Sequence, residues 1–86
     1  MPEIARFFGI VIKMYFDDHE PPHFHAQYGE HEALLNINTL GIISGSLPPK
    51  AFGLVTEWAT IYRENLLADW EKAKNFEPLE KIPPLR

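Results

Sequence analysis

The sequence contains no cysteine. This absence excludes disulfide bonds and metal sites built on thiolates, so a metal would have to be held by imidazole and carboxylate groups. The first six residues also lack the charged and then apolar pattern of a secretion signal. No apolar run approaches the length that spans a bilayer. We therefore expect a cytoplasmic protein without a membrane segment.

Basic residues are scarce as well. Eight lysines and arginines stand against 12 aspartates and glutamates, which gives a net charge of −4. This balance does not favour a protein that coats nucleic acid through bulk electrostatics. The chain has only 86 residues, so it forms a single small domain that buries about 60–65% of its unfolded surface. A docked tail or a homodimer would add to this thin stability margin.

Aromatic and β-branched residues dominate the first third of the chain and favour strands. Residues 7–16 read as one bent strand or as a hairpin, depending on whether Gly9 is a bulge or a tight turn. Alternation of side chains from Ile10 onward predicts one core face. The residues expected on that face are Ile10, Ile12, Met14 and Phe16. Further strands are predicted at residues 23–28, 31–37 and 40–45, and their short connections favour an antiparallel meander.

The second half of the chain predicts one long helix. Apolar residues recur at steps of three and four from Pro49 to about residue 74. Such a helix would be nearly 40 Å long, whereas a strand of this sheet covers about 17–20 Å. It must therefore bend or break near residues 63–65, protrude, or pack on a second copy, and we favour a long helix supported by dimerisation.

The last eleven residues form an extended, proline-rich tail. Phe76, Leu79, Ile82 and Leu85 recur every three residues, the spacing of a polyproline-type ribbon with one apolar side. We expect this tail to dock on the domain of residues 1–75 or on a partner. The predicted fold class is α+β: a small antiparallel sheet of about four strands packed on a long C-terminal helix.

Three of the four histidines lie within the stretch 17–25, around Pro21-Pro22. Asp17 and Asp18 are typical of a turn, and a carboxylate there could also orient a histidine. His23 and His25 alternate on a strand, so both project from one face with Cα atoms about 6.5–7 Å apart. This spacing suits two ligands of one divalent metal such as zinc.

Two further ligands would complete such a site. His19 lies across the proline turn and could swing in as a third imidazole, and Glu30 or Glu32 could supply a carboxylate. The order His-x-His-x4-Glu from His23 to Glu30 is similar to part of the cupin metal motif, although the framing glycines of that motif are absent.

The same histidines also suit catalysis. The run His23-Phe24-His25-Ala26-Gln27-Tyr28 resembles the motif of one branch of the histidine-triad nucleotide hydrolases and transferases. That resemblance implies that His25 would be the nucleophile toward a phosphate. With the histidine cluster, it leads to the hypothesis of a phosphoesterase or ribonuclease-type enzyme in which His25 is the nucleophile or base and His23 assists. In that family the motif comes late and behind a helix, whereas here it comes early.

A plainer alternative applies to the whole face. Lys13, Tyr15 and Gln27 are predicted to share it with His23 and His25, and we treat them as a candidate ligand face. A sheet covered by one helix leaves its other face in water. Histidines on such a face need no role beyond solubility and cross-strand contact.

Several motifs are spread over nearly the whole chain. The most specific of them is His19-Glu20-Pro21-Pro22-His23-Phe24-His25. The others are Met1-Pro2-Glu3-Ile4, Phe8-Gly9-Ile10, Met14-Tyr15, Ser44-Gly45-Ser46-Leu47-Pro48, Glu57-Trp58 and Lys81-Ile82-Pro83-Pro84-Leu85. With these motifs the chain resembles one uncharacterised bacterial family, known as domain of unknown function 4160. The resemblance implies no catalytic residue.

What the resemblance does imply is a partner. Members of the family are small and stand alone, and they are often encoded beside another small domain, of unknown function 2442. This arrangement resembles a toxin–antitoxin or regulatory gene pair. It implies that the protein is the protein-binding component of a two-protein system.

Overall fold

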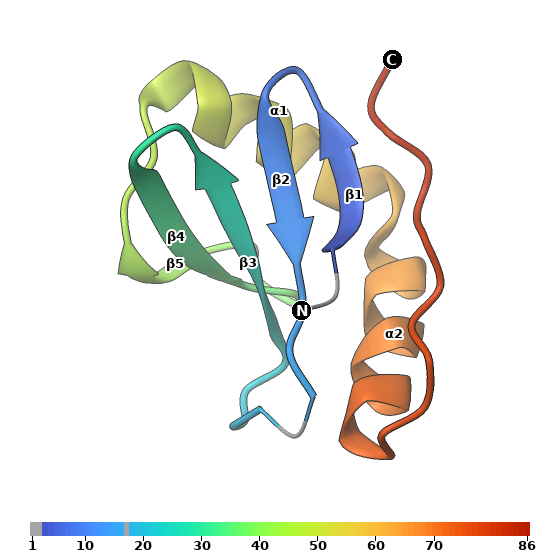
Figure 1. Ribbon diagram of the computed structural model, residues 1–86. Helices are drawn as coiled ribbons and strands as arrows, with labels where there is room; N and C mark the ends of the chain where they lie inside the picture. Colours follow the sequence, from blue (N-terminus) through green and yellow to red (C-terminus); the bar gives the residue numbers. More distant parts are fainter. Residues whose placement is uncertain (1–2, 17) are drawn as a thin grey trace.

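The chain forms an antiparallel sheet of five strands followed by two helices (Figure 1). The computed structural model describes residues 3–16 and 18–86. Met1, Pro2 and Asp17 lie outside the described residues. Of these, Asp17 was expected to form a turn with Asp18. The elements are β1 Glu3–Phe7, β2 Ile10–Lys13, β3 His23–Tyr28, β4 His31–Asn36, β5 Ile42–Gly45, α1 Pro49–Ile61 and α2 Arg63–Lys74.

The sheet has one strand more than the four that the sequence predicted. The chain turns back at Phe8-Gly9, so the first apolar stretch is a hairpin and Glu3–Phe7 becomes a separate edge strand. Each strand pairs antiparallel with the next in the order β1-β2-β3-β4-β5, which confirms the meander. At β5 the backbone of Gly45 has a φ of +79°, and a Cβ there would collide with the carbonyl oxygen of Glu32. Only glycine therefore fits at this position.

One face of the sheet forms the core with α1, as the alternation predicted. Side chains from the inner strands and from α1 are buried on it. They include Ile10, Ile12, Phe24, Ala26, Ala33, Leu35, Val55, Trp58 and Ala59. Phe16 was expected to be part of this core, but it is 41% exposed. The prediction was wrong there because β2 ends at Lys13, so the alternation no longer determines which way later side chains point.

The predicted long helix is broken within the single chain. Tyr62 leaves the helical conformation (φ −110°, ψ 25°) and separates α1 from α2. Just after it, the Arg63 Nε donates a hydrogen bond of 3.1 Å to the carbonyl of Ile37. The break lets α2 turn and run past the side of the sheet toward the β2–β3 loop (Figure 1). Neither helix, among the described residues, is long and apolar enough to cross a membrane.

The tail packs along β1 and α2 of its own chain (Figure 1). Ile82 and Leu85 are buried. The Ile82 N–H donates to the carbonyl of Ile4 at 2.8 Å, and Trp58 Nε1 donates to the carbonyl of Pro83 at 2.8 Å. The tail thereby covers the open edge of β1 and completes the core. Phe76 is 67% exposed, and it stacks on Phe16 of the β2–β3 loop.

A buried carboxylate joins the tail to α2. Asp69 is 2% exposed, its Oδ1 accepts the Glu80 backbone N–H at 3.0 Å, and its Oδ2 has no hydrogen-bond partner among the described residues. Burial raises the pKa of Asp69, and the Glu80 N–H and Lys72 lower it by less. Because the pKa is higher in the folded state, this group lowers the stability as pH rises through its folded-state pKa.

Replacing Asp69 with asparagine should remove this pH-dependent penalty. Asparagine keeps an acceptor for the Glu80 N–H and buries no charge. We expect Asp69→Asn to match the wild type below the ordinary aspartate pKa, and to gain stability relative to it as the pH rises toward neutrality. Urea unfolding at a series of pH values measures the difference. A constant difference across the series would contradict the buried-charge interpretation.

Candidate metal centre

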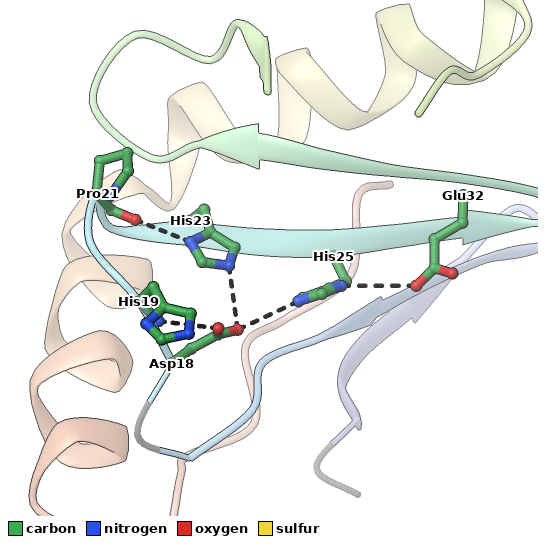
Figure 2. A network of polar contacts seen from close by, with 6 residues as sticks. All are labelled: Asp18, His19, Pro21, His23, His25 and Glu32. Atoms are coloured by element: carbon green, nitrogen blue, oxygen red, sulfur yellow. Dashed lines mark hydrogen bonds and ion pairs between the residues drawn. The ribbon is translucent and has the colours of Figure 1, made fainter. Parts of the chain in front are cut away.

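The stretch 18–25 gathers two imidazoles around one carboxylate (Figure 2). His23 and His25 are two residues apart in β3 and point to the face opposite the core, as predicted. Asp18 comes from the loop between β2 and β3, and its carboxylate lies between the two rings (Figure 2). Asp18, His23 and His25 each offer one ligand atom, and these three atoms lie within 4.8 Å of one another.

His23 is held at both ring nitrogens. Its Nδ1 lies 2.8 Å from the carbonyl oxygen of Pro21, and its Nε2 lies 3.1 Å from Oδ2 of Asp18. A carbonyl oxygen only accepts hydrogen bonds, so Nδ1 must carry a proton. The Pro21 contact therefore fixes the ring orientation and turns Nε2 toward Asp18.

His25 is held in a similar way. Its Nε2 lies 3.4 Å from the same Oδ2 of Asp18, and its Nδ1 lies 3.5 Å from Oε2 of Glu32. Glu32 faces His25 because the β3–β4 register pairs Gln27 with Glu32, which puts their side chains on the same face as His25. Both histidines thus direct Nε2 to one oxygen and Nδ1 to an outer acceptor.

Two of the sequence-predicted metal ligands are not part of this group of three ligand atoms. His19 is exposed, and it contributes its backbone N–H, which donates to Oδ1 of Asp18 at 2.9 Å. Glu30 is exposed in the two-residue turn at the far end of β3. Asp18, which the sequence indicated only as a turn residue able to orient a histidine, takes the central place. Of the two candidate carboxylates, Glu32 rather than Glu30 contacts the cluster.

Lys13, Tyr15 and Gln27, which were predicted to share the face with the histidines, lie around His25. Lys13 is paired with His25 across the β2–β3 ladder and donates from Nζ to Oε1 of Gln27 at 3.0 Å. The Tyr15 ring meets the His25 ring edge to face, with centroids 4.5 Å apart. All three are half-buried. This part of the face is therefore packed, and it is less solvated than the plainer alternative supposed.

Burial of His23 is the feature that the sequence did not reveal. The His23 side chain is 5% exposed, because α2 brings the Trp70 ring to 5.2 Å from the imidazole. Lys74 of α2 also pairs with Glu20 of the loop at 3.5 Å. Trp58 and Trp70 were both predicted to be packing residues, and both are buried. The second of them also forms one wall of the histidine cluster.

The electrostatics of the cluster favour an ionised Asp18. Partial burial alone would raise the pKa of the Asp18 carboxyl, but the His19 backbone N–H and the imidazoles of His25 and His23 lower it by more. The pKa of Asp18 therefore lies below its ordinary value. At neutral pH the centre therefore has an ionised Asp18 facing two ring nitrogens, and the side chain of Glu32 lies behind His25.

Comparison with known proteins identifies a family for this chain but indicates no activity. A search of curated proteins and a search of solved structures found no match. Residues 9–71 match the family described as Domain of unknown function (DUF4160). The match includes the loop, β3 and most of α2, and so every residue of the cluster described above. The chain belongs to the DUF4160 family.

Proposed function

We propose that this protein binds a divalent metal ion, best represented by zinc, through Asp18, His23 and His25. One observation carries the proposal. Two imidazoles, each with Nδ1 directed at an outer acceptor, turn Nε2 toward the same oxygen of Asp18. Metal-ligating histidines typically donate the other ring N–H to a carbonyl or a carboxylate, which orients the ring and raises its basicity.

The hydrogen-bond arrangement calls for a cation. With a proton on Nδ1 for the Pro21 carbonyl, a neutral His23 presents the lone pair of Nε2 to a carboxylate oxygen 3.1 Å away. Two acceptors at that distance repel each other unless a proton or a metal ion lies between them. A divalent ion would satisfy His23, His25 and Asp18 together.

The separations of the two histidine Nε2 atoms from Asp18 fit a zinc ion. Ligand bonds of 2.0–2.1 Å at tetrahedral angles place neighbouring ligand atoms about 3.3 Å apart. The two Nε2 atoms lie 3.1 and 3.4 Å from Oδ2 of Asp18. Nitrogen and oxygen ligands without thiolate suit zinc, and related first-row ions such as nickel, manganese or iron would compete for the site.

The same geometry weighs against His25 as a free nucleophile. Its Nε2 faces Asp18 and its Nδ1 faces Glu32, so neither nitrogen is directed at open solvent. If the protein is an enzyme, the metal is the better candidate for the reactive group. Three protein ligands leave a fourth position for water or a substrate, which is the arrangement of catalytic zinc sites.

Calorimetric titration of zinc into EDTA-treated protein tests the proposal. We expect one saturable site per chain, and a rise in the thermal unfolding midpoint when zinc is present, because the ion binds the folded state. Magnesium, which prefers oxygen ligands and keeps its water, should produce neither effect. Absence of stoichiometric zinc binding would leave Asp18 as the partner of protonated histidines and would overturn the proposal.

We also propose that β5 binds the partner protein implied by the family resemblance. The β1 edge of the sheet is covered by the tail, whereas β5 is the last strand at the other edge. Ile42 and Ile43 are 42% and 46% exposed. No charged residue occurs from residue 33 to residue 49, although charges are the usual protection of an open edge. A partner strand added here would pair with the backbone and bury both isoleucines.

Ile43→Lys tests this surface, because a charge at the edge opposes strand addition. Co-expression with a protein of the domain of unknown function 2442 family should yield a complex with the wild type and none with Ile43→Lys. Ile61→Lys is the control, since Ile61 is also an exposed isoleucine but lies in α1. Analytical ultracentrifugation of the protein alone completes the test. A dimer that Ile43→Lys dissociates would assign β5 to a second copy and overturn the partner proposal.

A further inference from the structure

A second concave site lies at the opposite end of the sheet from the histidine cluster. The β1–β2 turn, the end of β3 and the start of α1 meet there (Figure 1). They line an open cavity of about 410 Å³, which is within the range of small-molecule sites. The lining residues are Phe8, Tyr28, Pro48, Lys50, Ala51 and Leu54. All but Lys50 present carbon-rich surface, so the cavity is apolar with one cationic group.

The conformation of Phe8 is unfavourable for folding. Phe8 and Gly9 form the two-residue turn of the first hairpin with φ values of +48° and +80°. Asparagine followed by glycine is the preferred pair for such a turn, and a bulky residue at positive φ is strained. The Phe8 side chain also remains 61% exposed, so burial does not offset the strain. Its ring forms one wall of the cavity.

Tyr28 forms a second wall, beside Gly9 of the turn. A Cβ on Gly9 would lie 3.4 Å from Cε1 of Tyr28, so the tyrosine ring lies against the turn. Tyr28 is 39% exposed. Two partly exposed aromatic side chains thus line the same cavity.

Lys50 supplies the charge. It makes no ion pair with any residue in the described ranges 3–16 and 18–86, and the first turn of α1 contains no acidic residue. No acidic side chain in the described part of the chain therefore pairs with the lysine beside the apolar walls. We propose that the cavity binds a small amphipathic anion, with an aryl or alkyl body against Phe8, Tyr28 and Leu54 and a carboxylate paired with Lys50.

Amide NMR with 4-phenylbutyrate as the probe tests this site. We expect saturable shifts at millimolar probe, centred on the amides of Phe8, Gly9, Tyr28 and residues 50–54. Lys50→Met should weaken binding about 10-fold, since a charged pair is removed. The neutral 4-phenylbutanamide should bind the wild type no better than 4-phenylbutyrate binds Lys50→Met. Lys81→Met, which removes an exposed lysine from the tail, should change nothing.

The Phe8→Asn variant provides a second test of the proposed anion site. Asparagine relieves the strain at positive φ, so the unfolding midpoint should rise by roughly 4–8 °C, while binding of 4-phenylbutyrate falls about 10-fold with the loss of one wall. A stable variant that binds as well as the wild type overturns the proposal. So does a destabilised variant, because Phe8 would then be serving the fold. Equal binding of the acid and the amide would also overturn it.

Discussion

Asp18→Asn should weaken zinc binding at least about 100-fold. Loss of an outer hydrogen-bond partner of a metal ligand already weakens binding about 10–100-fold, and here a direct, charged ligand is lost. Asparagine can still accept the His19 N–H hydrogen bond that holds the loop, so the fold should persist. Titration calorimetry and the zinc-dependent shift of the unfolding midpoint measure the effect. A variant that retains the affinity of the wild type would remove Asp18 from the ligand set.

Pairs of substitutions in the same region distinguish residues of the metal centre from nearby residues that do not contact it. Glu32→Gln should weaken binding about 10-fold, because Glu32 orients His25 from behind, whereas Glu30→Gln in the adjacent turn should have no effect. His25→Ala should abolish binding, and His31→Ala should leave it intact.

His19→Ala decides between the sequence-based ligand set and the geometry described above. Because His19 donates only its backbone N–H to Asp18, the variant should bind zinc with unchanged affinity. A large loss in His19→Ala would mean that the imidazole swings in, as the sequence first indicated.

Trp58→Ala should cost about 3–5 kcal/mol of the free energy of unfolding, the usual range for truncating a buried tryptophan. Trp58 is 0% exposed and contacts Phe7 and Phe24 of the sheet, with ring centroids 5.3 and 6.1 Å away. Its Nε1 also donates to the carbonyl of Pro83. One side chain therefore connects α1, the sheet and the tail. In a domain whose total stability is on the order of 5–15 kcal/mol, the loss would leave a marginal fold.

Urea unfolding monitored by the fluorescence of Trp70 measures this loss, since Trp70 remains as the reporter. Ile61→Ala is the control on the same helix. Ile61 is 59% exposed, so its truncation should change the stability by no more than about 0.5 kcal/mol. If the two variants were equally stable, the contacts of Trp58 with the sheet and the tail would not be central to the core.

Local patterns in the sequence were sufficient for much of this fold. Side-chain alternation is a property of the extended backbone itself. It therefore places His23 and His25 on one face and Phe24 on the other, independently of any tertiary contact. The two-residue turn at Gly29-Glu30 also sets the register, and with it the position of Glu32 beside His25. A signal that favoured Glu32 over Glu30 was therefore present in the sequence.

Contacts between distant segments determined the features of the fold and of the site that local patterns did not predict. Asp18 and His19 are adjacent in a loop, and no periodicity specifies which of them faces β3, because the loop backbone is set by its packing. The break at Tyr62 was one of several ways to fit an overlong helix, and the contact of Arg63 with Ile37 accompanies the one adopted. That break brings Trp70 into contact with His23, although the two residues are far apart in the sequence. The sequence alone determined that the two histidines share a face. Only the tertiary structure buried one of them and placed a carboxylate between them, because both results depend on residues that local rules do not connect.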